Sequence, residues 1–185
     1  MKLTLPIVLI GPMAAGKTTI ARILEQKTGV RNVPMDMVRW YYYFKDGYSA
    51  AHDHGLKTLV EKADYWKRFD LLSVERILSD FKDAIIDLGA GHSYYPDPDE
   101  LKRAQTLLAP LPNVFLLLPS LDPVISDKAC RERIKAVYPA VTEDELSINQ
   151  IFLHHHSNKF LAKHTVTTLR KTPEAVADEL LSLMC

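Results

Sequence analysis

The stretch that decides the fold of this 185-residue chain is Gly11-Pro12-Met13-Ala14-Ala15-Gly16-Lys17-Thr18. It matches the pattern GxxxxGK[ST], in which a glycine-rich loop joins a strand to a helix. The apolar run Leu5–Ile10 precedes it, and the amphipathic segment Lys17–Lys27 follows it and stops at Gly29. Glycines let successive backbone N–H groups face one anion, and the helix start adds its positive dipole end. The sequence therefore predicts a phosphate-binding loop.

The residues of this loop have expected roles in binding ATP and Mg²⁺. Lys17 is expected to reach the β- and γ-phosphates as a point charge, and Thr18 offers a hydroxyl to Mg²⁺. A chance glycine-rich turn before an ordinary helix is the alternative, and the strand and helix patterns around the motif argue against it. The expected ATP-binding residues are Gly11, Met13, Ala14, Ala15, Gly16, Lys17, Thr18 and Thr19.

Strand and helix patterns alternate along the rest of the chain. Helices separate the expected strands, which implies βαβ units and a parallel sheet. Met37–Phe81 is expected to be mostly helical, with a helix beginning near Met37, and Glu143–Leu161 reads as one helical stretch. We predict one α/β domain over residues 1–185, with a three-layer P-loop fold and a central, mostly five-stranded parallel sheet. The expected strands are residues 5–10, 30–35, 84–88, 113–118 and 165–168.

The composition of the chain argues against nucleic-acid, membrane and cysteine-bound metal partners. Lys plus Arg equals Asp plus Glu, at 23 each, so the basic excess of a nucleic-acid-binding domain is absent. No apolar run is long enough to span a bilayer, and Met1–Ile10 reads as a buried strand rather than a signal peptide. Cys130 and Cys185 have no metal-ligand spacing and are expected to be free thiols. We expect a cytoplasmic monomer or homodimer that binds a small-molecule acceptor, without a nucleic-acid or membrane partner.

Two aspartates follow expected strands and are candidates for the chemistry. Asp87 ends the apolar run Ala84–Ile86 and is the expected Mg²⁺ ligand, directly or through a water; its alternative role is a turn residue before Gly89. Asp36 follows the strand Val30–Met35 and is a candidate base that accepts a hydroxyl proton. Its alternative role is the N-cap of the next helix, and the two roles are compatible.

These motifs resemble shikimate kinase and its relatives in the nucleoside monophosphate kinase group over nearly the whole chain. The phosphate loop fits closely, Gly89-Ala90-Gly91 is similar to the family's triple-glycine loop beside the acceptor, and Val114–Leu118 is similar to the strand before the lid. The resemblance implies an ATP- and Mg²⁺-dependent kinase that transfers the γ-phosphoryl group of ATP to a hydroxyl of a small metabolite. It also implies a helical substrate-binding region near residues 37–81 and a lid near residues 120–150.

The resemblance assigns further residues and also breaks in places. Arg131 and Arg133 lie where the family has a lid arginine on the γ-phosphate, and only one of them can face inward. The alternative role for each is a solvated arginine on a charged helix. Beside the residues that the resemblance assigns, Arg39 shares a helix face with Asp36 and His92 directly follows Gly91. The expected acceptor contacts are therefore Asp36, Arg39, Gly89, Ala90, Gly91 and His92. Pro34 replaces an aspartate of the family's Asp-x-Asp pair, and Leu72 replaces a substrate-binding arginine. The family's second substrate-binding arginine is expected near His154–His156, where this chain has histidines instead. These losses argue against shikimate as the acceptor.

Several readings of the acceptor region stay open. Trp40, Tyr41, Tyr43, Tyr65 and Trp66 can form a stacking or cation–π pocket, although core packing is favoured for most of them. That pocket would suit a nucleoside, nucleotide or amino-sugar acceptor. His154, His155 and His156 cannot share one helix face, so a three-histidine metal site is not expected, although one of them or Asn158 can contact substrate. A sensor that binds ATP without transferring phosphate is the rival from another class.

Overall fold

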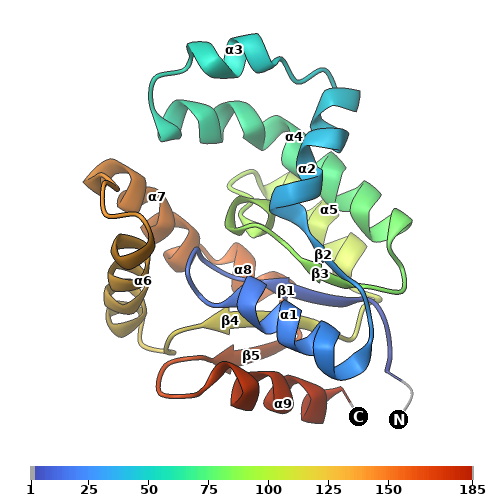
Figure 1. The fold of residues 1–185 in the computed structure, drawn as a ribbon. Helices are drawn as coiled ribbons and strands as arrows, with labels where there is room; N and C mark the ends of the chain where they lie inside the picture. Colours follow the sequence, from blue (N-terminus) through green and yellow to red (C-terminus); the bar gives the residue numbers. More distant parts are fainter. Residues whose placement is uncertain (1–2, 185) are drawn as a thin grey trace.

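The computed structural model describes residues 3–184, and its centre is a five-stranded, fully parallel sheet (Figure 1). The strand order is β2-β3-β1-β4-β5. This arrangement confirms the predicted fold class. The strands are β1 (Ile7–Ile10), β2 (Asn32–Pro34), β3 (Ile85–Asp87), β4 (Val114–Leu118) and β5 (His164–Thr167).

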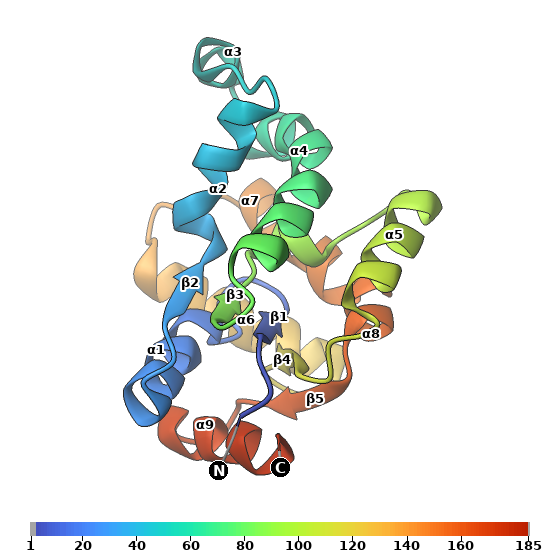
Figure 2. The ribbon, with the colours of Figure 1, turned by 90° about the vertical axis from the view of Figure 1, so that its right-hand side faces the viewer.

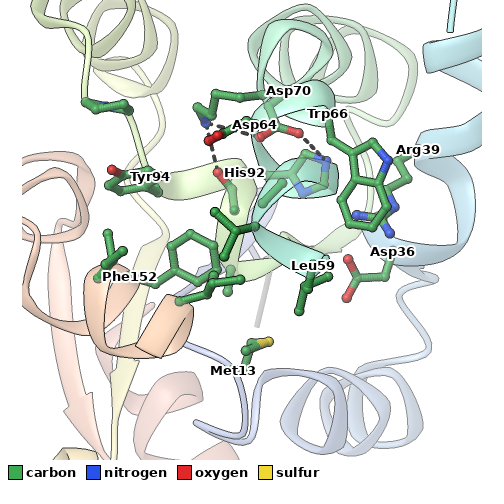
Figure 3. Close-up of a pocket in the computed structure, with 18 residues that line it drawn as sticks. Met13, Asp36, Arg39, Leu59, Asp64, Trp66, Asp70, His92, Tyr94 and Phe152 are labelled. Atoms are coloured by element: carbon green, nitrogen blue, oxygen red, sulfur yellow. Dashed lines mark hydrogen bonds and ion pairs between the residues drawn. The ribbon is translucent and has the colours of Figure 1, made fainter. Parts of the chain in front are cut away.

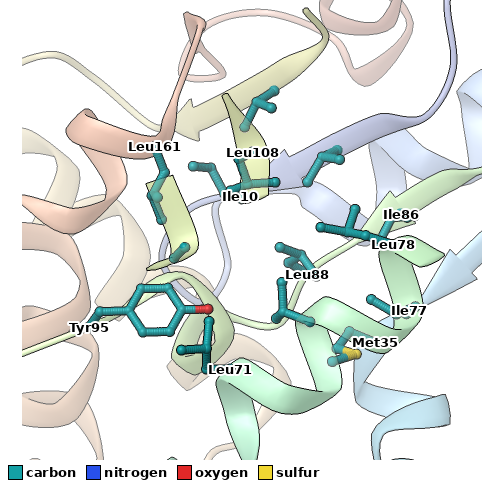
Figure 4. Packing of buried hydrophobic residues seen from close by; sticks show 14 of the residues in the cluster. Ile10, Met35, Leu71, Ile77, Leu78, Ile86, Leu88, Tyr95, Leu108 and Leu161 are labelled. Atoms are coloured by element: carbon teal, nitrogen blue, oxygen red, sulfur yellow. The ribbon is translucent and has the colours of Figure 1, made fainter. Parts of the chain in front are cut away.

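Helices cover both faces of the sheet (Figure 2). Alternate residues of the strands point to opposite faces. On one face Ile7, Leu9 and Phe115 pack against α1 (Lys17–Thr28) and α9 (Pro173–Leu183). On the other, Val8, Ile10 and Leu116 pack against α4 (Leu59–Asp80), α5 (Pro98–Leu108) and α8 (Ser157–Leu161), in the cluster drawn in Figure 4. Burial on both faces explains why the strands read as continuous apolar runs.

The helical region expected after the second strand consists of α2 (Met35–Lys45), α3 (Ala50–Gly55) and α4. It projects away from the sheet, with α3 farthest out (Figure 1). A separate aromatic cluster of Tyr43, Tyr48, Tyr65 and Phe69 holds it together. Thr58 and Glu61 form a capping box that starts α4.

The expected start of the second helix, near Met37 with Asp36 as its cap, is wrong. Helix α2 begins at Met35, directly after β2, and Pro34 occupies the N-cap position without a side-chain hydrogen bond. Asp36 therefore lies in the first helical turn, where its negative charge is favoured by the helix dipole. Its carboxylate is not used as a cap.

The helical stretch expected at residues 143–161 is interrupted. Helix α7 (Glu143–His154) ends because His155 is extended, and the short α8 follows. Ser157 ties the break to a distant segment, since its hydroxyl accepts a 3.0 Å hydrogen bond from the backbone N–H of Tyr95. Helices α6 (Pro123–Val137) and α7 lie together on one side of the molecule (Figure 1). Within residues 3–184, no helix combines the length and apolar character that crossing a bilayer requires.

Candidate active site

The loop between β1 and α1 has the backbone conformation that its glycines predict. Gly11 and Gly16 have φ values of 135° and 105°, in the region that favours glycine. At Gly11 a Cβ would overlap the carbonyl oxygen of Leu117 in the neighbouring β4. The loop is therefore held close against the sheet, at the carboxyl end of β1 and in front of the α1 N-terminus, where an anion is favoured.

Lys17 lies at the start of α1 and is buried under this loop. Its Nζ donates hydrogen bonds to the carbonyl oxygens of Gly11 at 2.9 Å and Pro12 at 3.0 Å. Burial lowers the pKa of Lys17, and the carboxylates of Asp87 and Asp36 oppose that shift. These two hydrogen bonds hold the Lys17 ammonium group against the backbone of the loop.

Thr18 and Asp87 form the candidate metal site beside the loop. Asp87 ends β3, in register with Leu9 of β1. The hydroxyl of Thr18 donates to Asp87 Oδ2 at 2.7 Å. Burial raises the pKa of Asp87, while Lys17 and the Thr18 hydrogen bond oppose the shift. A hydroxyl and a carboxylate next to a phosphate site are hard oxygen ligands that fit Mg²⁺.

A cavity of about 870 Å³ opens over the loop. One wall is the phosphate loop with the start of α1, and the other is α6 with the segment that leads to α7. Both walls are needed to enclose a nucleotide, because the loop alone contacts only phosphates. The lining residues are Met13, Ala14, Gly16, Lys17, Thr18, Thr19, Asp36, Leu59, Ala90, Arg133, Ile134, Val137, Tyr138, Pro139, Ala140, Val141 and Glu145.

Helix α6 turns one of its two candidate arginines toward this cavity. Arg133 Nη1 donates to the carbonyl oxygen of Ala14 at 3.0 Å and to the Thr168 hydroxyl at 3.3 Å. Arg131 points elsewhere and pairs with Asp127 at 3.0 Å and Glu143 at 2.7 Å. Arg131 lines neither this cavity nor the one described next. Of the two, only Arg133 lines the cavity over the loop.

Helix α7 contributes a contact to the loop that the sequence did not suggest. The buried Asn149 accepts a 2.7 Å hydrogen bond from the Met13 N–H, and its amide donates to the Met13 carbonyl at 3.3 Å. This two-way contact fixes the loop against α7. An asparagine within a helical pattern carries no sequence signal for such a role, since 136 residues separate the partners.

A second cavity of about 370 Å³ lies next to the first (Figure 3). Met13, Asp36, Leu59 and Ala90 line both cavities, so the two meet at these residues. The wall is apolar where the first turn of α4 faces α7, and polar toward α2, the middle of α4 and the loop after β3. The remaining lining residues are Arg39, Val60, Ala63, Asp64, Trp66, Lys67, Asp70, Gly91, His92, Tyr94, Pro96, Ile148, Ile151 and Phe152.

Asp36 stands at this junction. Its carboxylate packs against Gly89, where an added Cβ would overlap Asp36 Oδ1. Because β2 and β3 are neighbours in the sheet, the residues that follow them meet at the same edge. All six expected acceptor contacts gather here: Asp36, Arg39, Ala90, Gly91 and His92 line the second cavity, and Gly89 supports Asp36.

Arg39 is held by aromatic rings at the cavity wall. Its Cζ lies 4.4 Å from the ring centroid of Trp40 and 4.6 Å from that of Trp66. Trp66 lines the cavity, whereas Tyr41 is exposed and Tyr43 and Tyr65 are in the aromatic cluster. Most of the aromatic residues thus pack within the helical region and do not present a free stacking face.

The run His154–His156 lies outside both cavities. His155 Nδ1 is 2.7 Å from the Ser157 hydroxyl, and Asn158 donates to the Phe152 carbonyl at 2.9 Å. These contacts stabilise the break between α7 and α8. In the part of the chain that the structure describes, no three His, Cys, Asp or Glu side chains are grouped to hold a metal ion.

Neither a protein-family model nor a curated protein matches this sequence. Among solved structures, the fold is similar to shikimate kinase from Acinetobacter baumannii in complex with shikimate (19% identity, TM-score 0.66, 97% of this chain and 93% of that one). It is also similar to a gluconokinase from Sinorhizobium meliloti 1021 (13%, 0.60, 100% and 93%) and a sugar kinase from Janibacter sp. HTCC2649 (17%, 0.53, 96% and 92%). At these identities the likeness shows a shared fold.

Proposed function

We propose that this chain is an ATP-dependent small-molecule kinase that transfers the γ-phosphoryl group of ATP to a hydroxyl of a metabolite other than shikimate. The observation that carries the proposal is the pair of adjoining cavities, one over the phosphate loop and one over the acceptor residues, which meet at Asp36. Phosphoryl transfer needs the γ-phosphate and the acceptor hydroxyl side by side and in line. The shared fold of kinases for hydroxylated molecules supports it.

On the nucleotide side, the proposed roles follow from position. The loop amides and Lys17 bind the β- and γ-phosphates, and Arg133 adds positive charge from α6. Thr18 and Asp87 would hold Mg²⁺, which neutralises charge on the phosphates when it is bound. The segment of residues 120–150 would act as the lid. Most of the rate enhancement then comes from positioning and electrostatics.

On the acceptor side, Asp36 is the proposed base that orients the hydroxyl and accepts its proton. The Asp36 carboxylate does not cap α2, and it lies where the two cavities meet, and both features suit this role. Shikimate is disfavoured because the cavity lacks a carboxylate clamp. Leu72 lines neither cavity, and one of the two cavity cations, Lys67, already pairs with Asp70 at 3.1 Å. A hydroxylated acceptor without a clamped carboxylate fits better.

Binding and transfer test the proposal separately. Calorimetric titration with ATP and Mg²⁺ is expected to show binding that Lys17→Ala abolishes. A panel of polyols, sugars, amino sugars and nucleosides, assayed by release of ADP, is expected to contain a phosphorylated acceptor. Asp36→Asn should stop transfer and leave ATP affinity intact. Binding that depends on Lys17, without transfer to any acceptor, would favour the ATP sensor.

The two arginines of α6 give a matched pair for the nucleotide side. Arg133→Ala is expected to lower kcat by about 10²-fold or more, because it removes charge aimed at the phosphates. Arg131→Ala removes an equal charge from the same helix, and among residues 3–184 it breaks ion pairs with Asp127 and Glu143, so kcat should stay close to that of the parent protein. Equal losses in both variants would contradict the proposed role of Arg133.

A further inference from the structure

The apolar wall of the second cavity is built by a hydrophobic cluster of its own. This cluster is separate from the two that cover the faces of the sheet, and all of its members line the cavity. They enclose a volume of about 370 Å³ and do not fill it. Apolar side chains around a cavity lack packing partners on one side, so a ligand with apolar surface is stabilised there. The members are Ala90, Ile148 and Phe152, with Met13, Leu59 and Tyr94 packed against them.

Two further apolar side chains of this wall are partly in solvent. Val60, in the first turn of α4, has 44% of its surface exposed, and Ile151 of α7 has 49%. Both line the cavity. A ligand that covers them removes apolar surface from water, which is favourable. The apolar character of the cavity therefore extends from its buried wall to side chains that solvent reaches.

Most of the buried polar atoms of the cavity wall bond to one another. The Asp70 carboxylate accepts a short hydrogen bond from the Tyr43 hydroxyl and one of 3.1 Å from Lys67. His92 Nε2 lies 3.4 Å from Asp70 Oδ1, and burial lowers the pKa of His92. His92 Nδ1 has no hydrogen-bond partner among residues 3–184, but it is buried and faces Gly89. This side of the wall thus offers few hydrogen bonds to a ligand that is polar all round.

The polar and apolar parts of the cavity lie at different ends. Figure 3 shows Asp36 and Arg39 at one end, and Phe152 and Tyr94 at the other. The rings of Phe152 and Tyr94 are tilted against each other with centroids 5.4 Å apart, and an aromatic or aliphatic group can pack on them. Asp64 also lines the cavity, but its side chain is exposed and hydrated by water. A reacting hydroxyl belongs at the Asp36 end.

We propose that the acceptor is an amphipathic alcohol, which places its hydroxyl at Asp36 and an apolar body of about the size of a ring against the wall formed by α4 and α7. The inference rests on the proposed function and names the class of its acceptor. A polyol or sugar acid with polar groups on every side fits less well. Its groups beside Ile148 and Phe152 would lose water without gaining a hydrogen bond, which costs free energy.

Calorimetric titration of the full chain with matched alcohols tests the preference for an apolar body. One pair is phenyl and methyl β-D-glucopyranoside, and the other is 3-phenoxy- and 3-methoxy-1,2-propanediol. The members of each pair carry the same hydroxyl groups and differ only in the apolar substituent. With ADP and Mg²⁺ present in place of ATP, we expect the phenyl member to bind at least about 10-fold more tightly in one pair or both. Equal binding within both pairs, or no binding by any member, would overturn the proposal.

Substitutions at the cavity and outside it locate the preference. The double variant Val60→Gln/Ile151→Gln makes the exposed part of the wall polar, and we expect it to bind the phenyl members about 10-fold more weakly and the methyl members unchanged. Val124→Gln is the matched control, because Val124 is the second residue of α6, as Val60 is of α4, and lines neither cavity. Equal losses in both variants, or no loss in the double variant, would reject the proposed site.

Failure of the proposed function would appear differently. The parent protein would then bind the phenyl members more tightly than the methyl members, yet release no ADP from ATP with any alcohol of the series. Failure of this inference alone would appear as transfer from ATP to a fully polar acceptor, without a preference within either pair. The two results are distinguishable, because the titration measures binding without any transfer.

Discussion

Replacing Gly89 by Ala puts the geometry of the acceptor side to a direct test. Gly89 has φ −60° and ψ 153°, an extended conformation that alanine adopts without strain. The added methyl group would overlap Asp36 Oδ1 and come within 2.8 Å of His92 Nδ1. The carboxylate therefore has to move, and the imidazole with it. The backbone does not, so the substitution acts on the site and leaves the fold in place.

The size of the effect follows from that displacement. A reactive group misplaced by about 1 Å can lower a rate by about 10²-fold, equivalent to about 2.7 kcal/mol in the activation barrier. We therefore expect kcat to fall about 100-fold. Affinity for ATP should change far less than kcat, because Gly89 does not line the nucleotide cavity and Asp36 lines it only where the two cavities meet. Overpacking costs about 1–3 kcal/mol of folding stability, offset by about 0.4–1 kcal/mol from the stiffer unfolded chain, so the protein should stay folded.

The assay compares kcat by ADP release with ATP affinity by calorimetry. Gly55→Ala is the matched control: Gly55 ends α3, and a Cβ there would have no neighbour within 4 Å. It should change neither quantity. Full activity in Gly89→Ala would refute the placement of Asp36 against this loop. A parallel loss of ATP affinity would show that the substitution acts through the phosphate loop instead.

The remaining predictions concern the loop, the buried thiol and pH. Asn149→Ala leaves the Met13 N–H without its hydrogen bond, so urea unfolding should show a free energy of unfolding lower by about 1–3 kcal/mol, and ATP should bind more weakly. Unchanged ATP affinity would contradict the role of Asn149 in supporting the phosphate loop. Burial raises the pKa of Cys130 to about 11. In a Cys185→Ser variant, the Cys130 thiol of the folded protein should therefore resist iodoacetamide at about pH 8 and react once urea unfolds the chain. Rapid labelling of Cys130 in the folded state would contradict its burial. Because folding lowers the pKa of His92 below its unfolded value of about 6.5, protons bind the unfolded chain more strongly, and stability should fall as pH drops from about 6.5. His92→Asn should flatten that slope in urea unfolding at several pH values, and an unaltered slope would assign it to other groups.

The part of the fold that the sequence predicted correctly depends on local patterns. The glycines at positions 11 and 16, next to an apolar run, indicate a loop that curls between a strand and a helix. The run Ala84–Ile86 indicates a buried strand, which places Asp87 at its carboxyl end. These signals involve residues close together in the chain, so side-chain size, backbone freedom and periodicity are enough to read them.

Helix boundaries were harder to predict, because competing local signals have similar strength. Asp36 is an acceptable N-cap, yet α2 begins at Met35, where the chain leaves β2 without a loop. The stretch from Glu143 looked continuous, yet it breaks at His155. At the first place, the N-cap preference that is lost amounts to only about 1 kcal/mol. At the second, the hydrogen bond between Ser157 and Tyr95 connects the break to a distant segment.

The sequence alone determined that a phosphate-binding loop joins a strand to a helix in a parallel α/β domain, and which residues form that loop. Only the tertiary structure decided that Arg133 faces the loop while Arg131 pairs with Asp127 and Glu143. Two residues apart on a helix, they are separated by a rotation of about 200°, so they point to nearly opposite sides of α6. Either one can be the inward-facing arginine until the packing of α6 is known. The contact of Asp36 with Gly89 likewise depends on how β2 and β3, which are far apart in the chain, pair in the sheet. A local sequence pattern does not predict such a pairing.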